Sequence, residues 1–148
     1  MMLDFTQPES FSPNTYLKKN QKRIFSIIKE VTGHAYILTA PQLFVDLTGD
    51  LTLAAMLSQL IYWSDRSIRP DGFVYKSAID WKNEVGASKR SVQKFNQLPY
   101  IETKIRRANG HPTTHYKVRF DVLIDQIYQL CQVYKPGIDP LLIDERKA

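Results

Sequence analysis

The chain contains a single cysteine, Cys131, among its 148 residues. One thiol cannot form an internal disulfide, and it cannot build a zinc site based on cysteines. Cys131 follows Val122, Ile127 and Leu130 in an apolar run with helical spacing. We therefore expect a half-buried helix residue, and the sequence predicts neither a disulfide scaffold nor a zinc-cysteine centre.

Long apolar runs are also lacking. No stretch approaches the roughly 18 consecutive apolar residues that a membrane span needs. The first ten residues are acidic and polar, without the basic and apolar regions of a signal peptide. We therefore expect a cytoplasmic protein with no membrane partner.

The six glycines stand apart from one another, so no phosphate-binding glycine loop is present. His111 and His115 are four residues apart, which brings side chains together on a helix but not on a strand interrupted by Pro112. The sequence therefore predicts no catalytic residues, no metal and no cofactor, and the chain is expected not to be an enzyme. The acids that could otherwise hold a metal fall at predicted helix ends and turns, where aspartate is common: Asp46, Asp50, Asp65 and Asp71.

Positive charge is concentrated in one part of the chain. The segment from Lys76 to Arg119 holds ten Lys and Arg against three acids, a net charge of +7. The whole chain carries +5, so the remainder sums to −2. Charge gathered on one structural unit is typical of a surface that meets phosphates.

The order of hydrophobic periodicity and turn signals predicts a mostly α protein with a small β-wing, a winged helix-turn-helix. An extended arm (1–14) precedes this domain (15–134), and a loose tail (135–148) follows it. The apolar helix over 52–64 is expected to be central to the core. The expected helices cover 15–31, 52–64, 77–85, 89–96 and 121–134, and a helix or turn is expected over 41–47. The expected strands cover 73–75, 101–106 and 114–120, and a short β-like run covers 35–38.

Three polar or small residues shape the middle of this domain. Ser77 and Ser88 are predicted N-caps of two short helices, and Gly86 suits the tight turn between them. On the last strand we expect Tyr116, Val118 and Phe120 on one face and His115, Lys117 and Arg119 on the other. The buried positions expected in the two helices are Ile79, Trp81, Val85, Val92 and Phe95.

The second short helix is the candidate recognition helix, which would offer its first turns to a major groove. Arginine can pair with guanine and glutamine with adenine. The alternative is a solvated helix face that happens to be basic. Because Val92 and Phe95 must face the core, the residues left for DNA are Ser88, Lys89, Arg90, Gln93, Lys94 and Gln97.

A hairpin is predicted around Gly110, with polar and basic residues that could reach phosphates or a narrow minor groove. The alternative is that Lys and Arg on edge strands block aggregation. Among the many aromatic residues, Tyr36, Tyr75 and Tyr100 are left open for stacking on single-stranded bases. The candidate contacts in the hairpin are Lys104, Arg106, Arg107, Asn109, His111 and Thr113.

Five segments of the chain carry a familiar order of motifs: Leu38–Leu43, Leu57–Trp63, Asp71–Lys76, Asp80–Arg90 and Pro112–Asp121. Together they resemble winged-helix replication initiators and replisome organisers of phages, plasmids and other bacterial mobile elements. The resemblance implies a domain that recognises an origin or operator, often as a dimer, with Ser88–Asn96 as recognition helix and Lys104–Lys117 as wing. The chain departs from the family at Leu98–Ile101, where the recognition helix is about a turn shorter.

The resulting hypothesis is a DNA-binding protein that prefers duplex DNA and acts in replication of a mobile element. We expect a homodimer, joined through the apolar stripe of the helix at 16–31 or at 122–134, and a possible replication-protein partner. Three alternatives stay open. They are an accessory protein that binds single-stranded DNA, a transcriptional repressor, and a protein-interaction module whose basic surface is incidental.

Overall fold

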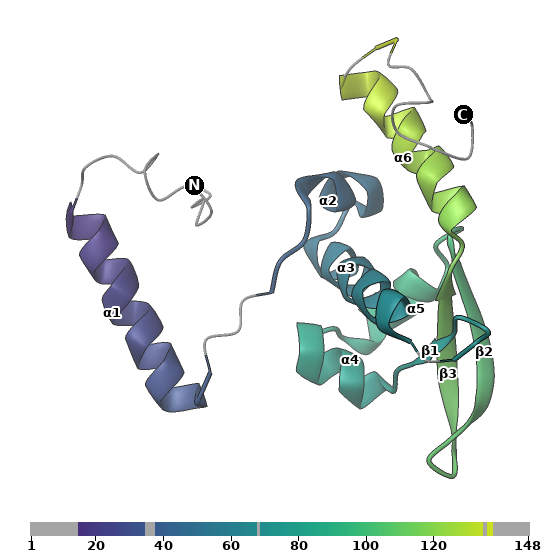
Figure 1. Ribbon diagram of the computed structural model, residues 1–148, viewed down its shortest axis with the longest axis horizontal. Helices are drawn as coiled ribbons and strands as arrows, with labels where there is room; N and C mark the ends of the chain where they lie inside the picture. Colours follow the sequence, from purple (N-terminus) through teal and green to yellow (C-terminus); the bar gives the residue numbers. More distant parts are fainter. Residues whose placement is uncertain (1–14, 35–37, 68, 135, 138–148) are drawn as a thin grey trace. The chain divides into compact units, whose positions relative to one another are not determined.

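The computed structural model describes residues 15–34, 38–67, 69–134 and 136–137 (Figure 1). The chain divides into two compact units, residues 1–37 and 38–148. The expected arm (1–14), most of the β-like run at 35–38 and nearly all of the tail (135–148) lie outside the described residues. The predicted domain limits of 15–134 stay a prediction.

The first unit contains helix α1, Thr15–Thr32. Gly33 ends this helix with a positive φ of 80°, and its N–H donates to the Lys29 carbonyl at 2.7 Å. Ile24, Ile27 and Val31 are exposed along one side of α1. The predicted helix is confirmed, and its apolar stripe is open to solvent.

The second unit contains the other elements, so the described part of the chain is mixed α/β, with six helices and one small sheet. Each predicted helix is confirmed to within two residues of its ends. The elements of the second unit are α2 (Gln42–Thr48), α3 (Leu51–Arg66), β1 (Val74–Tyr75), α4 (Ala78–Val85), α5 (Lys89–Asn96), β2 (Ile101–Ala108), β3 (His111–Val118) and α6 (Phe120–Tyr134).

Side-chain caps explain where the short helices begin. The Ser77 hydroxyl accepts from the Asp80 N–H while the Asp80 carboxylate accepts from the Ser77 N–H, a reciprocal capping box. Ser88 caps α5 in the same way by accepting from the Ser91 N–H at 3.1 Å. Between the two helices, Gly86 adopts a φ of 69°, which most side chains disfavour.

The sheet is antiparallel, with strand order β1-β3-β2. Strands β2 and β3 are joined by the two residues Asn109 and Gly110, whose φ angles are 53° and 81°. Two positive φ values are what the common type I′ hairpin turn requires, and Asn-Gly is its preferred sequence. The paired strands therefore continue to Ala108 and His111, and the hairpin projects beyond the helices (Figure 1).

Helix α3 is the centre of the second unit, because it packs against α2, α4, α5, β1 and β3. Its Met56, Leu57 and Leu60 are fully buried. A cluster of three buried aromatic rings, Trp81, Phe95 and Tyr116, then joins α4, α5 and β3. The ring centroids lie 5.5 Å apart for Trp81–Phe95, 5.6 Å for Trp81–Tyr116 and 6.0 Å for Phe95–Tyr116.

The prediction that Ile79 is buried is wrong, since its side chain is 68% exposed. Ile79 lies two residues before Trp81, which is fully buried. Residues two apart on an α-helix point to opposite sides of it. Once Trp81 faces the core, Ile79 must face solvent.

The predicted alternation of the last strand is confirmed from His115 to Val118, but its predicted end is wrong. His115 and Lys117 lie on the face opposite Tyr116 and Val118, and His115 is fully buried there between its cross-strand neighbours Tyr75 and Lys104. Its ring lies 5.6 Å from the Tyr75 ring, and Nδ1 donates to the Thr113 carbonyl at 2.9 Å. Phe120 does not continue β3 but begins α6, where it is largely exposed.

The aromatic cluster gives a direct test of the fold. Phe95→Ala removes a fully buried ring, so the free energy of unfolding should fall by about 3–5 kcal/mol. Ile79→Ala, on an exposed site, should change it by less than about 0.5 kcal/mol. Urea unfolding followed by circular dichroism measures both. Equal losses for the two variants would contradict the described core.

Candidate nucleic-acid interface

Helix α5 presents a continuous polar stripe to solvent. Lys89, Arg90, Gln93 and Lys94 are all exposed, and so is Gln97, which caps the C-terminal end of the helix. Their spacing places them along one side of the helix, because residues three and four apart are neighbours on its surface. Phe95 is buried and Val92 is half-buried on the other side, as predicted.

The long side chains of this stripe have no competing partners. In the part of the chain that the structure describes, Lys89, Arg90, Gln93 and Lys94 make no side-chain hydrogen bond or ion pair. The Ser88 hydroxyl, in contrast, is used as the N-cap and also lies 3.1 Å from the Ser91 hydroxyl. The four long side chains are therefore the available contacts, and Ser88 positions the helix that carries them.

The hairpin residues divide between two faces of the sheet. Residues directly opposite each other on paired strands share a face, and successive residues alternate between faces. Arg107 pairs with Pro112 and belongs with Ile101 and Tyr116 to the face that packs on the helices. Lys104 and Arg106 belong to the opposite face, together with Thr113. The structure therefore does not bring the predicted hairpin contacts together in one patch.

Arg106 is held by an acid that the sequence analysis did not associate with the hairpin. One of its guanidinium nitrogens donates to the Asp71 carboxylate at 2.6 Å. This bond ties the loop after α3 to β2, across 35 residues of sequence. Because the Asp71 charge balances the Arg106 charge, Arg106 is less available to a phosphate than the other predicted contacts.

Phe73 lies beneath three cations of the outer face. Its ring is 97% buried, and the Nζ atoms of Lys104 and Lys117 lie 4.7 and 5.6 Å from its centroid. The Arg106 guanidinium lies 5.0 Å from the same ring. Cations stacked over an aromatic face are attracted by its quadrupole. Lys117 therefore belongs to this cluster although it was not among the predicted site residues.

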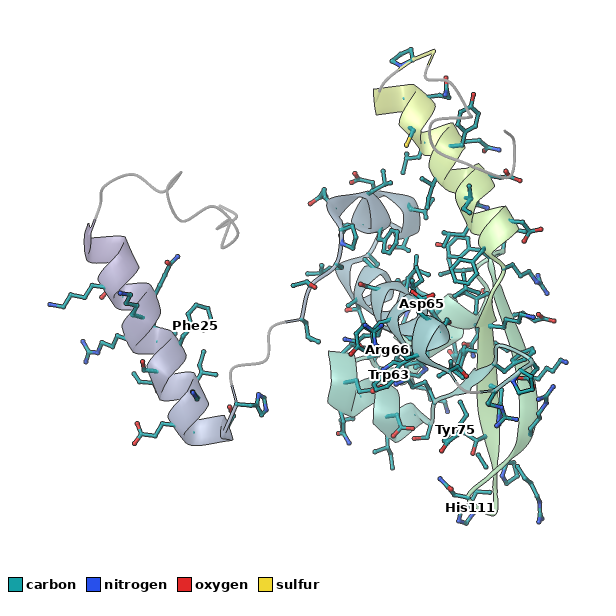
Figure 2. All side chains as sticks on the ribbon, in the orientation of Figure 1. Phe25, Trp63, Asp65, Arg66, Tyr75 and His111 are labelled. Carbon is teal, nitrogen blue, oxygen red and sulfur yellow. The ribbon has the colours of Figure 1, made fainter. Side chains whose placement is uncertain are left out.

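The tip of the hairpin carries the remaining predicted residues. Arg107, Asn109 and His111 are exposed there, and Figure 2 shows His111 at the far end of the hairpin. The Thr113 hydroxyl donates to the His111 carbonyl at 3.1 Å, so Thr113 stabilises the tip. In the described part of the chain no ion pair holds Arg107 or His111 at the tip, and Lys104 on the outer face has none either.

Lys76 does not contribute to the surface, although it was counted in the basic segment. Its ammonium group is nearly buried and lies 2.6 Å from both carboxylate oxygens of Glu84. Sequence counting cannot detect this, because the pairing joins the end of β1 to the last turn of α4. The effective positive surface is therefore smaller than the charge count implied.

The tyrosines that were candidates for base stacking differ in how far their side chains are exposed. Tyr100 is buried, and its burial raises the pKa of the phenol, so stacking on a base is excluded for it. Tyr75 is 41% exposed, and Tyr36 lies outside the described residues. Trp63 is 40% exposed, which its place in an apolar helix did not predict.

The described residues can also be searched for a group of side chains that would hold a metal ion. No three His, Cys, Asp or Glu side chains among them are grouped so as to hold a metal ion. His111 and His115 stand four residues apart on an extended strand, which separates them by about 13 Å.

No single helix in the described ranges is long and apolar enough to cross a membrane. Helices α2 and α3 reach the length and apolar composition of a membrane span only when they are taken together, and the chain bends by 116° between them.

Comparisons of the chain with protein-family models, with curated proteins and with solved structures found no match. The resemblance to winged-helix replication proteins therefore remains an expectation. What the interface can do must be argued from its own geometry and charge.

The Asp71–Arg106 bond makes stability depend on acid pH. The hydrogen bond from Arg106, supported by the Phe73 N–H, lowers the pKa of Asp71 from 3.8 to about 2. A carboxyl group with a lowered pKa in the folded state stabilises the fold above about pH 4. That contribution disappears as the pH falls towards 2.

Asp71→Asn should therefore show a shallower loss of the free energy of unfolding between pH 4 and pH 2 than the natural chain. Unfolding by urea at several pH values, followed by circular dichroism, measures this. Arg106→Gln removes the largest cause of the lowered pKa but leaves the Phe73 N–H bond to Asp71, so its profile should lie between those of Asp71→Asn and the natural chain. An unchanged profile in Asp71→Asn would show that the bond does not form in solution.

Proposed function

We propose that this chain is a winged-helix protein that binds duplex DNA, with α5 in the major groove and the β2–β3 hairpin tip on the backbone or in the minor groove. Helices α4 and α5, joined at Gly86, form the helix-turn-helix of this proposal. The hairpin that follows α5 is its wing. Duplex binding is favoured over a protein-interaction module because the exposed groups are cationic and unpaired.

The observation that carries the proposal is the stripe on α5. Three cations, Lys89, Arg90 and Lys94, stand beside Gln93 on an exposed helix face with no internal partners among the described residues. A solvated structural helix usually alternates its charges, whereas this helix contains no acid. Arg and Gln on one face also match the hydrogen-bonding edges of guanine and adenine.

The hairpin supports the same orientation through its tip. Arg107 lies on the sheet face that packs on the helices, so it is the hairpin cation on the same side of the sheet as α5. Asn109 is the first residue of the turn, and His111 directly follows the turn. Lys104 and Lys117, on the outer face, would act on phosphates from a distance rather than read bases.

A role in replication of a mobile element, with a replication-protein partner, is part of the proposal and rests on the resemblance alone. A transcriptional repressor would use the same residues.

Dimerisation is proposed through α1, because its exposed Ile24, Ile27 and Val31 form an apolar stripe on a separate unit.

The test is a double charge reversal on α5. Arg90→Glu with Lys94→Glu should weaken duplex binding by roughly 2–6 kcal/mol, at least about 30-fold in Kd. The dependence of log Kd on log salt should also become shallower, because fewer counterions are released. Fluorescence anisotropy with a labelled random duplex, across a salt series, measures both quantities.

The matched control reverses two cations elsewhere. Lys22→Glu with Lys29→Glu on α1 changes the net charge by the same amount, at exposed positions of the first unit. Duplex affinity should change far less than for the α5 pair. If the two pairs weaken binding equally, affinity follows net charge and the assignment of α5 is wrong. If the natural chain binds no duplex at low salt, the proposed function is wrong.

A further inference from the structure

A cleft of about 400 Å³ lies on the second unit, away from the α5 stripe. It is formed by the end of α3, the loop that follows, β1 and two residues of α4, Asp80 and Glu84, and none of the α5 residues lines it. Three of its residues, Trp63, Arg66 and Tyr75, are labelled in Figure 2. Its volume falls in the range of about 300–1,000 Å³ that is usual for small-ligand sites.

Two large aromatic side chains in this cleft are not used by the core. Trp63 and Tyr75 are 40% and 41% exposed, whereas the core of the same unit buries the rings of Phe73, Trp81, Phe95, Tyr100 and Tyr116. Trp63 is fixed in place by the edge of Tyr62, with ring centroids 5.2 Å apart, and by the Lys76 ammonium 5.2 Å from its centroid. Tyr75 rests on the buried ring of His115. Both rings are thus positioned and remain accessible.

The charges of the cleft favour an anion. The acids that line it are already engaged, because Glu84 binds the Lys76 ammonium and Asp80 forms the capping box of α4. Arg66 and Arg69 are exposed. The Arg66 guanidinium carbon lies 3.7 Å from the centroid of the Tyr62 ring, and one guanidinium nitrogen donates to the Tyr62 carbonyl. Arg69 has one weak ion pair, 3.6 Å from Asp71.

We propose that this cleft binds an unpaired nucleotide of a single strand, with the base stacked on Trp63 and Tyr75 and the phosphate paired with Arg66 and Arg69. Exposed aromatic rings beside backbone-pairing cations are the usual means of binding single-stranded nucleic acid. Arginine held on an aromatic ring also offers a flat surface to a base. This site goes beyond duplex binding by α5 and does not depend on it.

The two tryptophans of the chain make the test direct. Trp81 is fully buried, so a ligand that stacks in the cleft changes the fluorescence of Trp63 alone. We expect an unlabelled oligothymidylate of about eight nucleotides to quench this fluorescence saturably. An abasic oligomer of the same length should not quench it. Equal quenching by the abasic oligomer would show that charge alone is recognised and would overturn base stacking.

Substitutions of residues that line the cleft test whether the oligothymidylate binds there. Tyr75→Ala should weaken oligothymidylate binding about 5- to 150-fold, the range for loss of one stacked base. Arg66→Gln should weaken it about 10-fold or more, because it removes a charge-assisted contact to the phosphate. Trp63→Phe should remove the quenching while anisotropy with a labelled strand still reports binding. Ile79→Ala is the matched control, since Ile79 is exposed on α4 but does not line the cleft. Unchanged affinity in both Tyr75→Ala and Arg66→Gln would overturn the proposal.

The α5 double reversal separates this site from the duplex site. Arg90→Glu with Lys94→Glu should lose duplex binding and keep the oligothymidylate quenching. If both are lost together, single strands bind along α5 and the cleft proposal is wrong. If the natural chain shows no quenching at low salt, the cleft binds no nucleotide, whether or not duplex binding is found.

Discussion

The second unit depends on the contact among three aromatic rings, Trp81, Phe95 and Tyr116. Each ring comes from a different element, and edge-to-face packing of such rings adds specific geometry to their burial. Through these contacts α4, α5 and β3 hold one another in place over α3. The exposed stripe of α5 and the direction of the hairpin are consequences of this packing, because Phe95 fixes which side of α5 faces outward.

A second constraint is the way in which the chain distributes its positive charge. Glu84 neutralises Lys76 inside the fold, and Asp71 holds Arg106 against the hairpin. Phe73 gathers Lys104 and Lys117 on the outer face of the sheet. The unpaired cations of α5 and the hairpin tip are what remains for a ligand. The basic segment is thus partly a structural network and partly an accessible surface.

The sequence predicted every described helix and both long strands, because capping residues, an Asn-Gly turn and apolar spacing are local signals. It did not predict the burial of His115, the exposure of Ile79 or the bond between Asp71 and Arg106. Burial of a strand residue depends on which neighbours cover the sheet, and Asp71 meets Arg106 only after the loop folds over β2. The aromatic cleft was missed for the same reason, although Tyr62, Trp63 and Arg66 together in one helical turn were a usable signal.

The central claim is that α5 and the hairpin tip meet duplex DNA. The most direct measurement is a nuclear magnetic resonance titration of the ¹⁵N-labelled full chain with a random duplex at low salt. The account predicts that the largest amide shifts fall in residues 89–97 and 107–111, with α6 unaffected. Largest shifts in α2 or α6, or no shifts in α5, would contradict it.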